Sequence, residues 1–306
     1  MLDIRKLRLL RELSHRGTIA AVAAALTYTP SAVSQQLSAL EREAGVPLLE
    51  RTGRTVRLTP AATTLVEHTE SILEILHRAS ADLADAATSL SGTLRIGTFP
   101  TAVPTITTPA VVTLSTDHPS LNLLVSELDP AKMADALRSD SLDLALIQEY
   151  DHVPLAREPG IGREPLMEEA VHLAALDAIS LHDSHEAPWI AGTPGTLCHT
   201  LTIRACEADG FTPYIRHHAD DFGAVLALVA AGQGVALVPD LAARNPPDGV
   251  VLTPQGIRRR TYLAYRRGTR SHPGIAAACQ ALHSVVSPKG QTVIPRSSAG
   301  AVGPVW

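Results

Sequence analysis

The sequence predicts an α/β protein built from a winged helix-turn-helix, a long linker helix and a larger α/β domain. Three observations support this prediction. Short helical patterns and a basic hairpin fill residues 1–60, a heptad pattern occupies residues 61–90, and from Thr93 short apolar runs alternate with helical segments. The 306 residues, 45% hydrophobic and 19% charged, are enough for the cores of two or three folding units.

The first two helices are short and have clear boundaries. The first repeats an apolar residue at every third position from Ile4 and ends before Gly17, which suits a left-handed helix end. Thr18 can cap the second helix, which covers 19–26 and is rich in alanine. These small side chains allow another helix to approach closely.

The third helix begins with Thr29 as N-cap and Pro30 in its first position, and it continues to about Ala44. One face is apolar, and the opposite face carries small hydroxyl and amide side chains. Such a face suits the major groove of DNA, where each base pair presents its own donor and acceptor pattern; an ordinary solvated face is the alternative. The candidate DNA-binding residues here are Thr29, Ser31, Ser34, Gln35 and Ser38.

A basic hairpin follows this helix directly. Two short apolar strands within residues 48–58 flank a Thr-Gly turn, and Arg51, Arg54 and Arg57 cluster there. A basic hairpin after a polar-faced helix is typical of the wing of a winged helix, which contacts phosphates or enters the minor groove. We therefore expect Arg51 and Arg54 to bind DNA, with solvated arginines as the alternative.

The charge distribution is compatible with this interpretation. The chain has a net charge of −5, but residues 1–60 carry nine Lys or Arg against five Asp or Glu, and residues 61–90 carry one against five. Because only charges near a duplex displace its counterions, a basic end on an acidic body is sufficient for phosphate binding.

The heptad pattern predicts a dimerisation helix. A long helix whose apolar seam has no partner within its own chain packs against a copy of itself. The helix restarts after Thr59-Pro60, and its seam consists of Leu65, Thr69, Ile72, Leu76, Ala79, Leu83, Ala86 and Leu90.

Residues beyond Thr93 predict a mostly parallel sheet with crossover helices, with two lobes as one arrangement. The last twenty residues, rich in Pro, Gly and Ser, predict a disordered tail. The strands are expected to be buried on both faces. They cover 94–98, 121–125, 142–147 and 235–238, and helices cover 130–137 and 222–231.

The segment from Leu7 to Pro60 resembles the DNA-binding region of LysR-type transcriptional regulators. The likeness continues at lower density and covers about residues 4–285. It implies a two-lobed effector domain similar to periplasmic binding proteins, a homodimer or homotetramer, and an effector in the interlobe cleft. The matching segments are 20–26, 31–37, 45–48, 50–51, 56–60, 92–97, 142–146 and 228–239.

The resemblance also implies a division into domains. The expected parts are the DNA-binding domain (1–60), the linker helix (61–90), the effector-binding domain (91–286) and the disordered tail (287–306). Lobe I is expected at about 91–160 plus 266–286, and lobe II at about 161–265.

Members of this family commonly hold a small effector, often a carboxylate, against the helix after the first strand of the effector domain. Free backbone N–H groups and a positive dipole end converge at such a place. Threonines at helix starts are also plain caps, which is the alternative. The corresponding candidate effector-binding residues are Thr98, Pro100, Thr101, Thr193, Thr196 and His218.

Other classes of site receive little support. No phosphate loop, nucleophile elbow or metalloprotease motif occurs, so we expect no catalytic site, metal or cofactor. His182 and His185 are interpreted as part of a polar loop. The N-terminus lacks a signal peptide, no apolar run could span a bilayer, and the three cysteines suit a reducing compartment, so we expect a cytoplasmic protein.

The expected function is therefore effector-controlled transcription regulation. The expected partners are double-stranded DNA with an interrupted inverted repeat, a small-molecule effector, further copies of the chain and RNA polymerase. One alternative is an α/β solute-binding or enzymatic protein whose N-terminal helices serve only oligomerisation. Another is a redox-sensing regulator, because Cys198 and Cys206 lie in roughly the region where peroxide-sensing relatives have a cysteine pair, although their spacing does not match cleanly.

Overall fold

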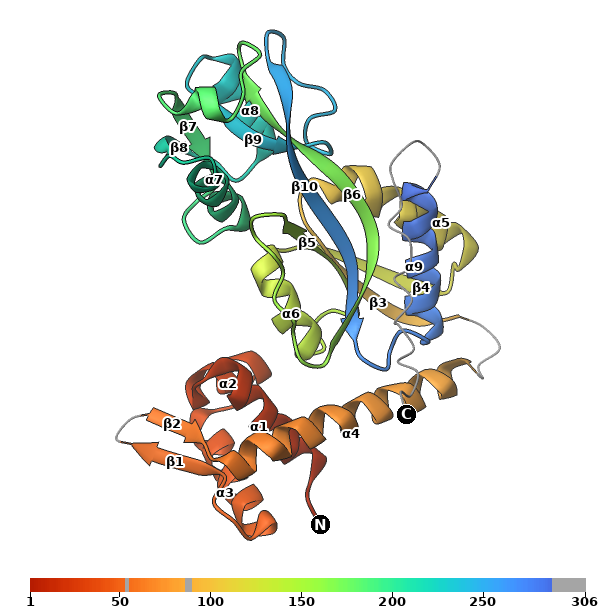
Figure 1. Cartoon of the computed structure of the whole chain (residues 1–306). Helices are drawn as coiled ribbons and strands as arrows, with labels where there is room; N and C mark the ends of the chain where they lie inside the picture. The colour runs from red at the N-terminus through yellow and green to blue at the C-terminus, as the bar shows by residue number, and fades with distance from the viewer. Residues whose placement is uncertain (53–54, 86–89, 288–306) are drawn as a thin grey trace, which may run out of the picture.

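The computed structural model describes residues 1–52, 55–85 and 90–287. Residues 288–306 of the predicted disordered tail and the seam residue Ala86 lie outside these ranges. The described helices include none that is long and apolar enough to cross a membrane. Figure 1 shows the N-terminal helices and hairpin at one end, the long helix α4 beside them, and a two-lobed domain above.

The first three helices have the boundaries that the sequence predicts. They are α1 (Ile4–Arg16), α2 (Ile19–Leu26) and α3 (Pro30–Ala44). Gly17 and Gly45 end α1 and α3 with φ of 73° and 69°, a left-handed conformation that favours glycine. The apolar faces of the three helices meet in one core, to which Leu10, Val33, Leu37 and Leu40 contribute fully buried side chains.

The hairpin consists of β1 (Leu49–Thr52) and β2 (Thr55–Leu58), which pair antiparallel. Leu48 and Leu49 at its start are buried in the same core as α1 to α3. Two backbone N–H groups there donate to Oε1 of Glu41 at 3.0 Å, which fixes the hairpin to the end of α3. The predicted winged helix-turn-helix is therefore present as one packed unit.

The long helix α4 spans Pro60–Asp85. Val66, Leu73 and Ala81 on one side are buried within the subunit, whereas Ile72, Leu76 and Leu83 of the predicted seam are 40%, 46% and 78% exposed. The seam prediction is wrong at both ends: Thr69 is fully buried within the subunit, and Leu65 packs against the core of the N-terminal helices. Leu90 follows the helix and packs against the core of the effector domain.

The effector domain contains a six-stranded sheet in the order β4-β3-β5-β10-β6-β9. Only β3–β4 and β3–β5 pair in parallel, whereas β10 pairs antiparallel with β5 and β6, and β6 with β9. The prediction of a mostly parallel sheet is therefore wrong. Its strands are β3 (Gly92–Thr98), β4 (Leu121–Glu127), β5 (Leu144–Tyr150), β6 (Ile161–Ala175), β9 (Ala236–Pro239) and β10 (Val251–Arg266).

The expectation that 121–125 is buried on both faces is also wrong. β4 is an edge strand of the sheet, and most of its residues are exposed. Leu124 and Val125 are 46% and 42% exposed. An apolar run alone does not distinguish an edge strand from a central one, because both supply hydrophobic residues to the sheet.

Two lobes are joined by β6 and β10, which run through both (Figure 1). Leu166 and Met167 of β6 belong to the core of lobe I. The boundary between the lobes therefore falls within these two strands, and not at residues 161 and 265 as expected. Lobe II adds a parallel pair, β7 (Pro188–Ala191) and β8 (Tyr214–His218).

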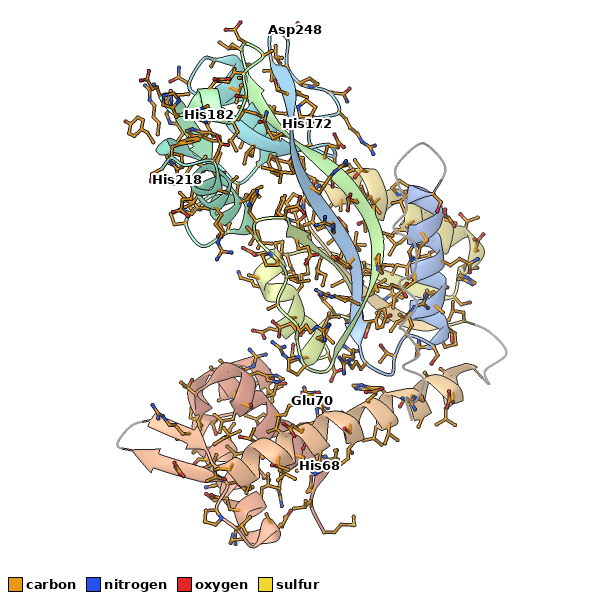
Figure 2. All side chains as sticks on the ribbon, in the orientation of Figure 1. His68, Glu70, His172, His182, His218 and Asp248 are labelled. Atoms are coloured by element: carbon orange, nitrogen blue, oxygen red, sulfur yellow. The ribbon has the colours of Figure 1, made fainter. Side chains whose placement is uncertain are left out.

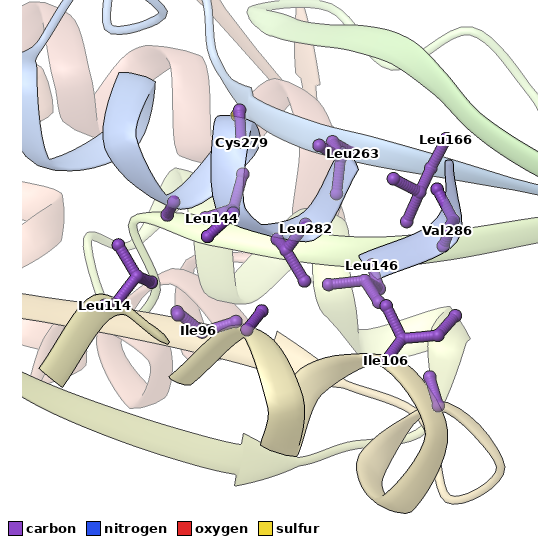
Figure 3. Close-up of a cluster of buried hydrophobic side chains, with 14 of the residues drawn as sticks. Ile96, Ile106, Leu114, Leu144, Leu146, Leu166, Leu263, Cys279, Leu282 and Val286 are labelled. Atoms are coloured by element: carbon purple, nitrogen blue, oxygen red, sulfur yellow. The ribbon is translucent and has the colours of Figure 1, made fainter. Parts of the chain in front are cut away.

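Helices cover both faces of the lobe I sheet. On one face lie α5 (Thr108–Asp117), which follows a single π-helical turn, η1 (Val103–Thr107), and α9 (Pro273–Val286). Their core includes Ile96, Leu146 and Leu263 from three neighbouring strands (Figure 3). On the other face, α6 (Pro130–Arg138) packs through Met133 and Leu137.

Lobe II is smaller. Its helices are α7 (Leu197–Ala208) and α8 (Phe222–Ala230), and its short 3₁₀ turn is η2 (His182–Ser184). Trp189 of β7 is fully buried in the core beneath α7.

Candidate nucleic-acid interface and interlobe pocket

The polar face of α3 forms one continuous surface. Thr29 accepts a hydrogen bond from the backbone N–H of Ala32 at 3.2 Å, so its hydroxyl holds the start of the helix. Gln35 is exposed. The structure brings this face together with Arg42, a cation that the sequence analysis did not single out. A shallow depression is lined by Ser31, Ser34, Gln35, Ser38 and Arg42.

The hairpin lies beside this helix (Figure 1). Arg54 and the side chain of Arg51 lie outside the described residues. Arg57 is exposed and is the register partner of Glu50 across the two strands. Arg42 therefore adds a cation to the polar face of α3, and Arg57 is an exposed cation on the hairpin.

A second candidate site is a cavity of about 240 Å³ between the lobes. Pro100, Thr101 and Thr196, three of the candidate effector-binding residues, line it. The other lining residues are Phe99, Glu127, Leu128, Asp129, Pro130, Gln148, Leu197, Cys198, Asp220, Phe222 and Arg259.

The remaining three candidate effector-binding residues lie outside the lining of this pocket. Thr98 is fully buried, and its hydroxyl lies 2.8 Å from that of Thr107. The Thr193 backbone N–H donates to Asp220 at 2.8 Å. His218 Nδ1 lies 3.0 Å from the carbonyl oxygen of Gly192. Thr193 therefore contacts Asp220, which lines the pocket, and His218 contacts the backbone of Gly192.

Three helices begin at the pocket, namely α6, α7 and α8. Each start is capped by a side chain: Asp129 accepts from Ala131 N, Thr196 from His199 N, and Asp221 from Ala224 N. Helix N-termini present backbone N–H groups and a positive dipole end, which favours anionic ligand groups. Hydrogen bonds from Thr193 also lower the pKa of Asp220, so this carboxylate stays charged.

Arg259 of β10 forms the floor of the pocket and is 1% exposed. Its Nε lies 2.7 Å from Oε1 of Glu169, and its Nη2 donates to the hydroxyl of Thr101 at 3.2 Å. Its guanidinium also lies 5.1 Å from the ring centroid of Phe99. A buried cation between both lobes can therefore meet a ligand at the point where the lobes join.

The sequence analysis missed Arg259 because it lies in a run of three arginines, which is usually a solvated surface. The signal that could have found it is the period-two pattern of a strand. Ile257, Arg259 and Thr261 are buried, whereas Arg258 is exposed.

Two polar groups near this floor have no hydrogen-bond partner among the described residues. They are Oε1 of Gln148, which lines the pocket, and the hydroxyl of Thr261. The two residues are cross-strand neighbours on β5 and β10. Buried polar atoms without partners are uncommon in folded proteins, and a bound molecule is one way to satisfy them.

The cysteines are poorly placed for redox chemistry. Cys198 lines the pocket, 3.9 Å from the hydroxyl of Tyr150, and burial raises the pKa of its thiol. Burial likewise raises the pKa of Cys206 to about 12. The two lie eight residues apart on α7, roughly 12 Å along the helix axis. A disulfide between them requires unwinding, because its Cα atoms lie within ~7 Å.

His182 lies in the 3₁₀ turn η2, and His185 follows it directly. Among the residues that the structure describes, no group of three or more His, Cys, Asp or Glu could hold a metal ion. His182 Nδ1 lies 3.3 Å from Asp209 instead. The region is the polar 3₁₀ turn and loop that the sequence indicated.

Comparison with protein families gives two matches. The family model described as "Bacterial regulatory helix-turn-helix protein, lysR family" matches residues 4–63. The model described as "LysR substrate binding domain" matches residues 87–287. Together they cover the winged helix, the first residues of α4 and both lobes.

Individual proteins are similar over most of the chain. The transcriptional dual regulator GltC of Bacillus subtilis is 27% identical over 247 residues, which are 78% of this chain and 81% of GltC. A probable hydrogen peroxide-inducible genes activator of Mycobacterium xenopi is 34% identical over 171 residues, 56% of this chain and 86% of that protein. A solved full-length OxyR variant from Pseudomonas aeruginosa has a TM-score of 0.61 at 20% identity, covering 95% of this chain and 98% of that one.

Proposed function

Because the chain belongs to the lysR family of bacterial regulatory helix-turn-helix proteins, we propose that it reads its operator with the polar face of α3 and binds a small carboxylate between its lobes. It is a DNA-binding transcriptional regulator with a substrate-binding domain, and not an enzyme. The alternative of a solute-binding or enzymatic protein is therefore wrong.

The DNA interface consists of Ser31, Ser34, Gln35 and Ser38, positioned by the cap Thr29. The observation that supports this assignment is the exposed polar face of α3, which lies opposite a fully buried apolar stripe. Side chains that both donate and accept hydrogen bonds match the base edges of the major groove. Arg51 and Arg54 on the wing contribute phosphate contacts, which add affinity without sequence information.

The assembly is a symmetric dimer through α4, or a tetramer of two such dimers. The exposed apolar seam of α4 supports this, because it has no cover within the subunit. A symmetric dimer presents two recognition helices and binds an interrupted inverted repeat. We further propose that the protein acts in the cytoplasm, where its DNA and RNA polymerase are found.

The effector is a small molecule with a carboxylate group. Three helix N-termini, the buried Arg259 and the hydroxyls of Thr101 and Thr196 surround the pocket. The acidic neighbours Asp129 and Asp220 already accept local hydrogen bonds. A cavity of about 240 Å³ suits a compact metabolite rather than a nucleotide cofactor.

DNA binding can be tested with an electrophoretic mobility shift on the DNA upstream of the protein's own gene. We expect a specific complex that survives excess random DNA. If excess random DNA removes the shift completely, the protein binds this DNA only non-specifically.

Effector binding can be tested with a thermal-shift screen of small mono- and dicarboxylic acids on the full chain. A ligand that binds the native state raises the melting temperature by mass action. The increase should disappear in Thr101→Val, which removes a hydroxyl from the pocket, and persist in Thr116→Val on the exposed side of α5. Hits that stabilise both variants equally would place the site elsewhere.

The redox alternative rests on the similarity to the peroxide-inducible genes activator, and the geometry of Cys198 and Cys206 favours the effector proposal. We expect hydrogen peroxide to leave the DNA shift of wild-type protein unchanged. A peroxide-dependent shift that Cys198→Ser abolishes would establish the redox alternative instead.

A further inference from the structure

The DNA-binding end of the chain is docked on lobe I of its own subunit. Arg8 of α1 lies 2.5 Å from Asp140, just after α6, and Arg16 lies 3.3 Å from Asp135 on α6. Nη2 of Arg11 donates to the carbonyl oxygen of Arg138 at 3.3 Å. Glu70 lies on the side of α4 that faces the effector domain (Figure 2).

This docking is closely fitted. Gly268, in the loop after β10, lies so close to α4 that a Cβ atom would overlap the carbonyl oxygen of Glu74. A Cβ on Gly160 would overlap the carboxylate of Glu70 in the same way. His77 Nδ1 also lies 3.1 Å from the carbonyl oxygen of Arg267. A side chain at Gly268 would separate the two parts because it meets the backbone of α4, whereas the Glu70 side chain can move away from one at Gly160.

The charges enclosed by this contact are incompletely satisfied. Four buried atoms here have no hydrogen-bond partner among the described residues: Arg11 Nε, His15 Nδ1, Glu70 Oε1 and Arg138 Nε. The nearest approaches to Glu70 are 3.9 Å from Arg11 and 3.6 Å from His15, beyond hydrogen-bond length.

Burial disfavours the charged forms of these groups. It raises the pKa of Glu70, although Arg11 and Arg138 act in the opposite direction. Burial, together with Arg138 and Arg11, lowers the pKa of His15. Buried polar groups without hydrogen-bond partners destabilise the closed contact. When the contact opens, water can hydrogen-bond to these groups, so opening stabilises them.

We propose that this contact is a releasable latch between the DNA-binding region and lobe I. The latch comprises Arg8, Arg11 and Glu70 on one side and Asp135, Asp140 and Gly268 on the other. Closed, it fixes the recognition helix relative to the effector domain; open, it lets the DNA-binding region reorient. α6 runs from the effector pocket at Pro130 to the latch at Arg138 and therefore connects the two. A regulatory role of the latch, in which effector binding opens or closes it, rests on the proposed function.

Carboxyl footprinting of the full-length protein tests the latch without DNA or effector. A carbodiimide couples glycine ethyl ester to accessible carboxylates, and mass spectrometry measures the labelling of Glu70, Glu67 and Glu169. Glu67 is exposed and reports free reactivity. Glu169 is 3% exposed between the lobes and reports that the effector domain stays folded.

The matched variants are Gly268→Ala and Gly249→Ala. The two glycines have φ of 84° and 83°, so both substitutions strain the backbone equally, but nothing lies within 4 Å of a Cβ on Gly249. We expect Glu70 to be labelled about tenfold more slowly than Glu67 in wild-type protein and Gly249→Ala, and at a similar rate to Glu67 in Gly268→Ala. Glu169 should stay protected in all three.

Salt provides a second measurement on wild-type protein, which does not depend on a variant folding. Salt screens the exposed pair Arg8–Asp140 and, more weakly, the part-buried pair Arg16–Asp135, so added salt should raise the labelling of Glu70 several-fold. If neither Gly268→Ala nor salt changes the labelling of Glu70, the interface is permanent. If Glu70 is labelled as fast as Glu67 in wild-type protein at low salt, the two parts are not docked. Either result overturns the latch, and both leave DNA binding by α3 untouched.

Discussion

Charging the exposed seam of α4 should break the dimer. Four large apolar side chains on this helix, Ile72, Ile75, Leu76 and Leu83, are 40–78% exposed in the subunit. Full burial of such a side chain contributes ~1.5–3 kcal/mol of hydrophobic free energy, so covering its exposed half contributes about 1 kcal/mol. For these four side chains on each of two paired helices, the free energy of association gains roughly 8 kcal/mol. The double variant Leu76→Glu with Leu83→Glu removes about half of this free energy of association and places like charges face to face.

A loss of ~4 kcal/mol weakens association by about a thousandfold. Sedimentation velocity should show a smaller oligomer at concentrations where wild-type protein is fully assembled, and operator binding should fall to that of half-sites. The control is Ser14→Glu with Thr116→Glu, which adds the same charge at exposed positions of α1 and α5, outside α4. If the seam variant keeps the wild-type mass and operator affinity, α4 is not the dimer interface.

Three other predictions concern affinity and stability. Arg51→Ala and Arg54→Ala should each weaken binding to all DNA and flatten its salt dependence by about one unit of slope; an unchanged slope would place the wing off the DNA. Arg259→Met should lower the stability of the effector domain by about 3–5 kcal/mol, because Glu169 stays buried without its cation. Adding Glu169→Gln should restore much of this loss, as measured by thermal melts. If the double variant is no more stable than Arg259→Met, the ion pair is not the cause of the loss. Burial alone would raise the pKa of Glu164, but hydrogen bonds from His283 and Arg270 lower this pKa from 4.5 to about 2. The contribution of the Glu164 carboxylate to folding stability is therefore complete above pH 4.5 and is lost as the pH falls towards 2. His283→Ala should narrow the difference in melting temperature between pH 6 and pH 3, and equal differences would exclude this interaction as the cause.

The N-terminal part could be predicted almost completely because its signals are local. Thr18, Thr29, Gly17 and Gly45 fix helix ends by their own side chains or backbone freedom, and the structure places each as expected. The polar face of α3 followed from helical periodicity alone. Arg42 was not predicted as part of this face, because a basic residue in the last turn of a helix is ordinarily explained by its interaction with the helix dipole.

The effector domain was less predictable because its decisive features are non-local. Pairing direction and edge position of strands depend on partners far along the chain, so β4 could not be recognised as an edge strand. Arg259 meets Thr101 across 158 residues, a contact that no local pattern encodes. Pro100, Thr101 and Thr196 were placed by family resemblance, whereas Arg259 and Gln148 required the fold.

The central claim, that α3 reads the operator sequence, is tested most directly by the ratio of affinities for operator and random DNA in Ser34→Ala and Gln35→Ala. Fluorescence anisotropy at one salt concentration measures both affinities, with Ser14→Ala on the exposed side of α1 as the control. We predict a loss of about 1–3 kcal/mol on the operator, little change on random DNA, and a control equal to wild type. Equal losses on both kinds of DNA, or no loss on either, would contradict the assignment of α3 as the recognition helix.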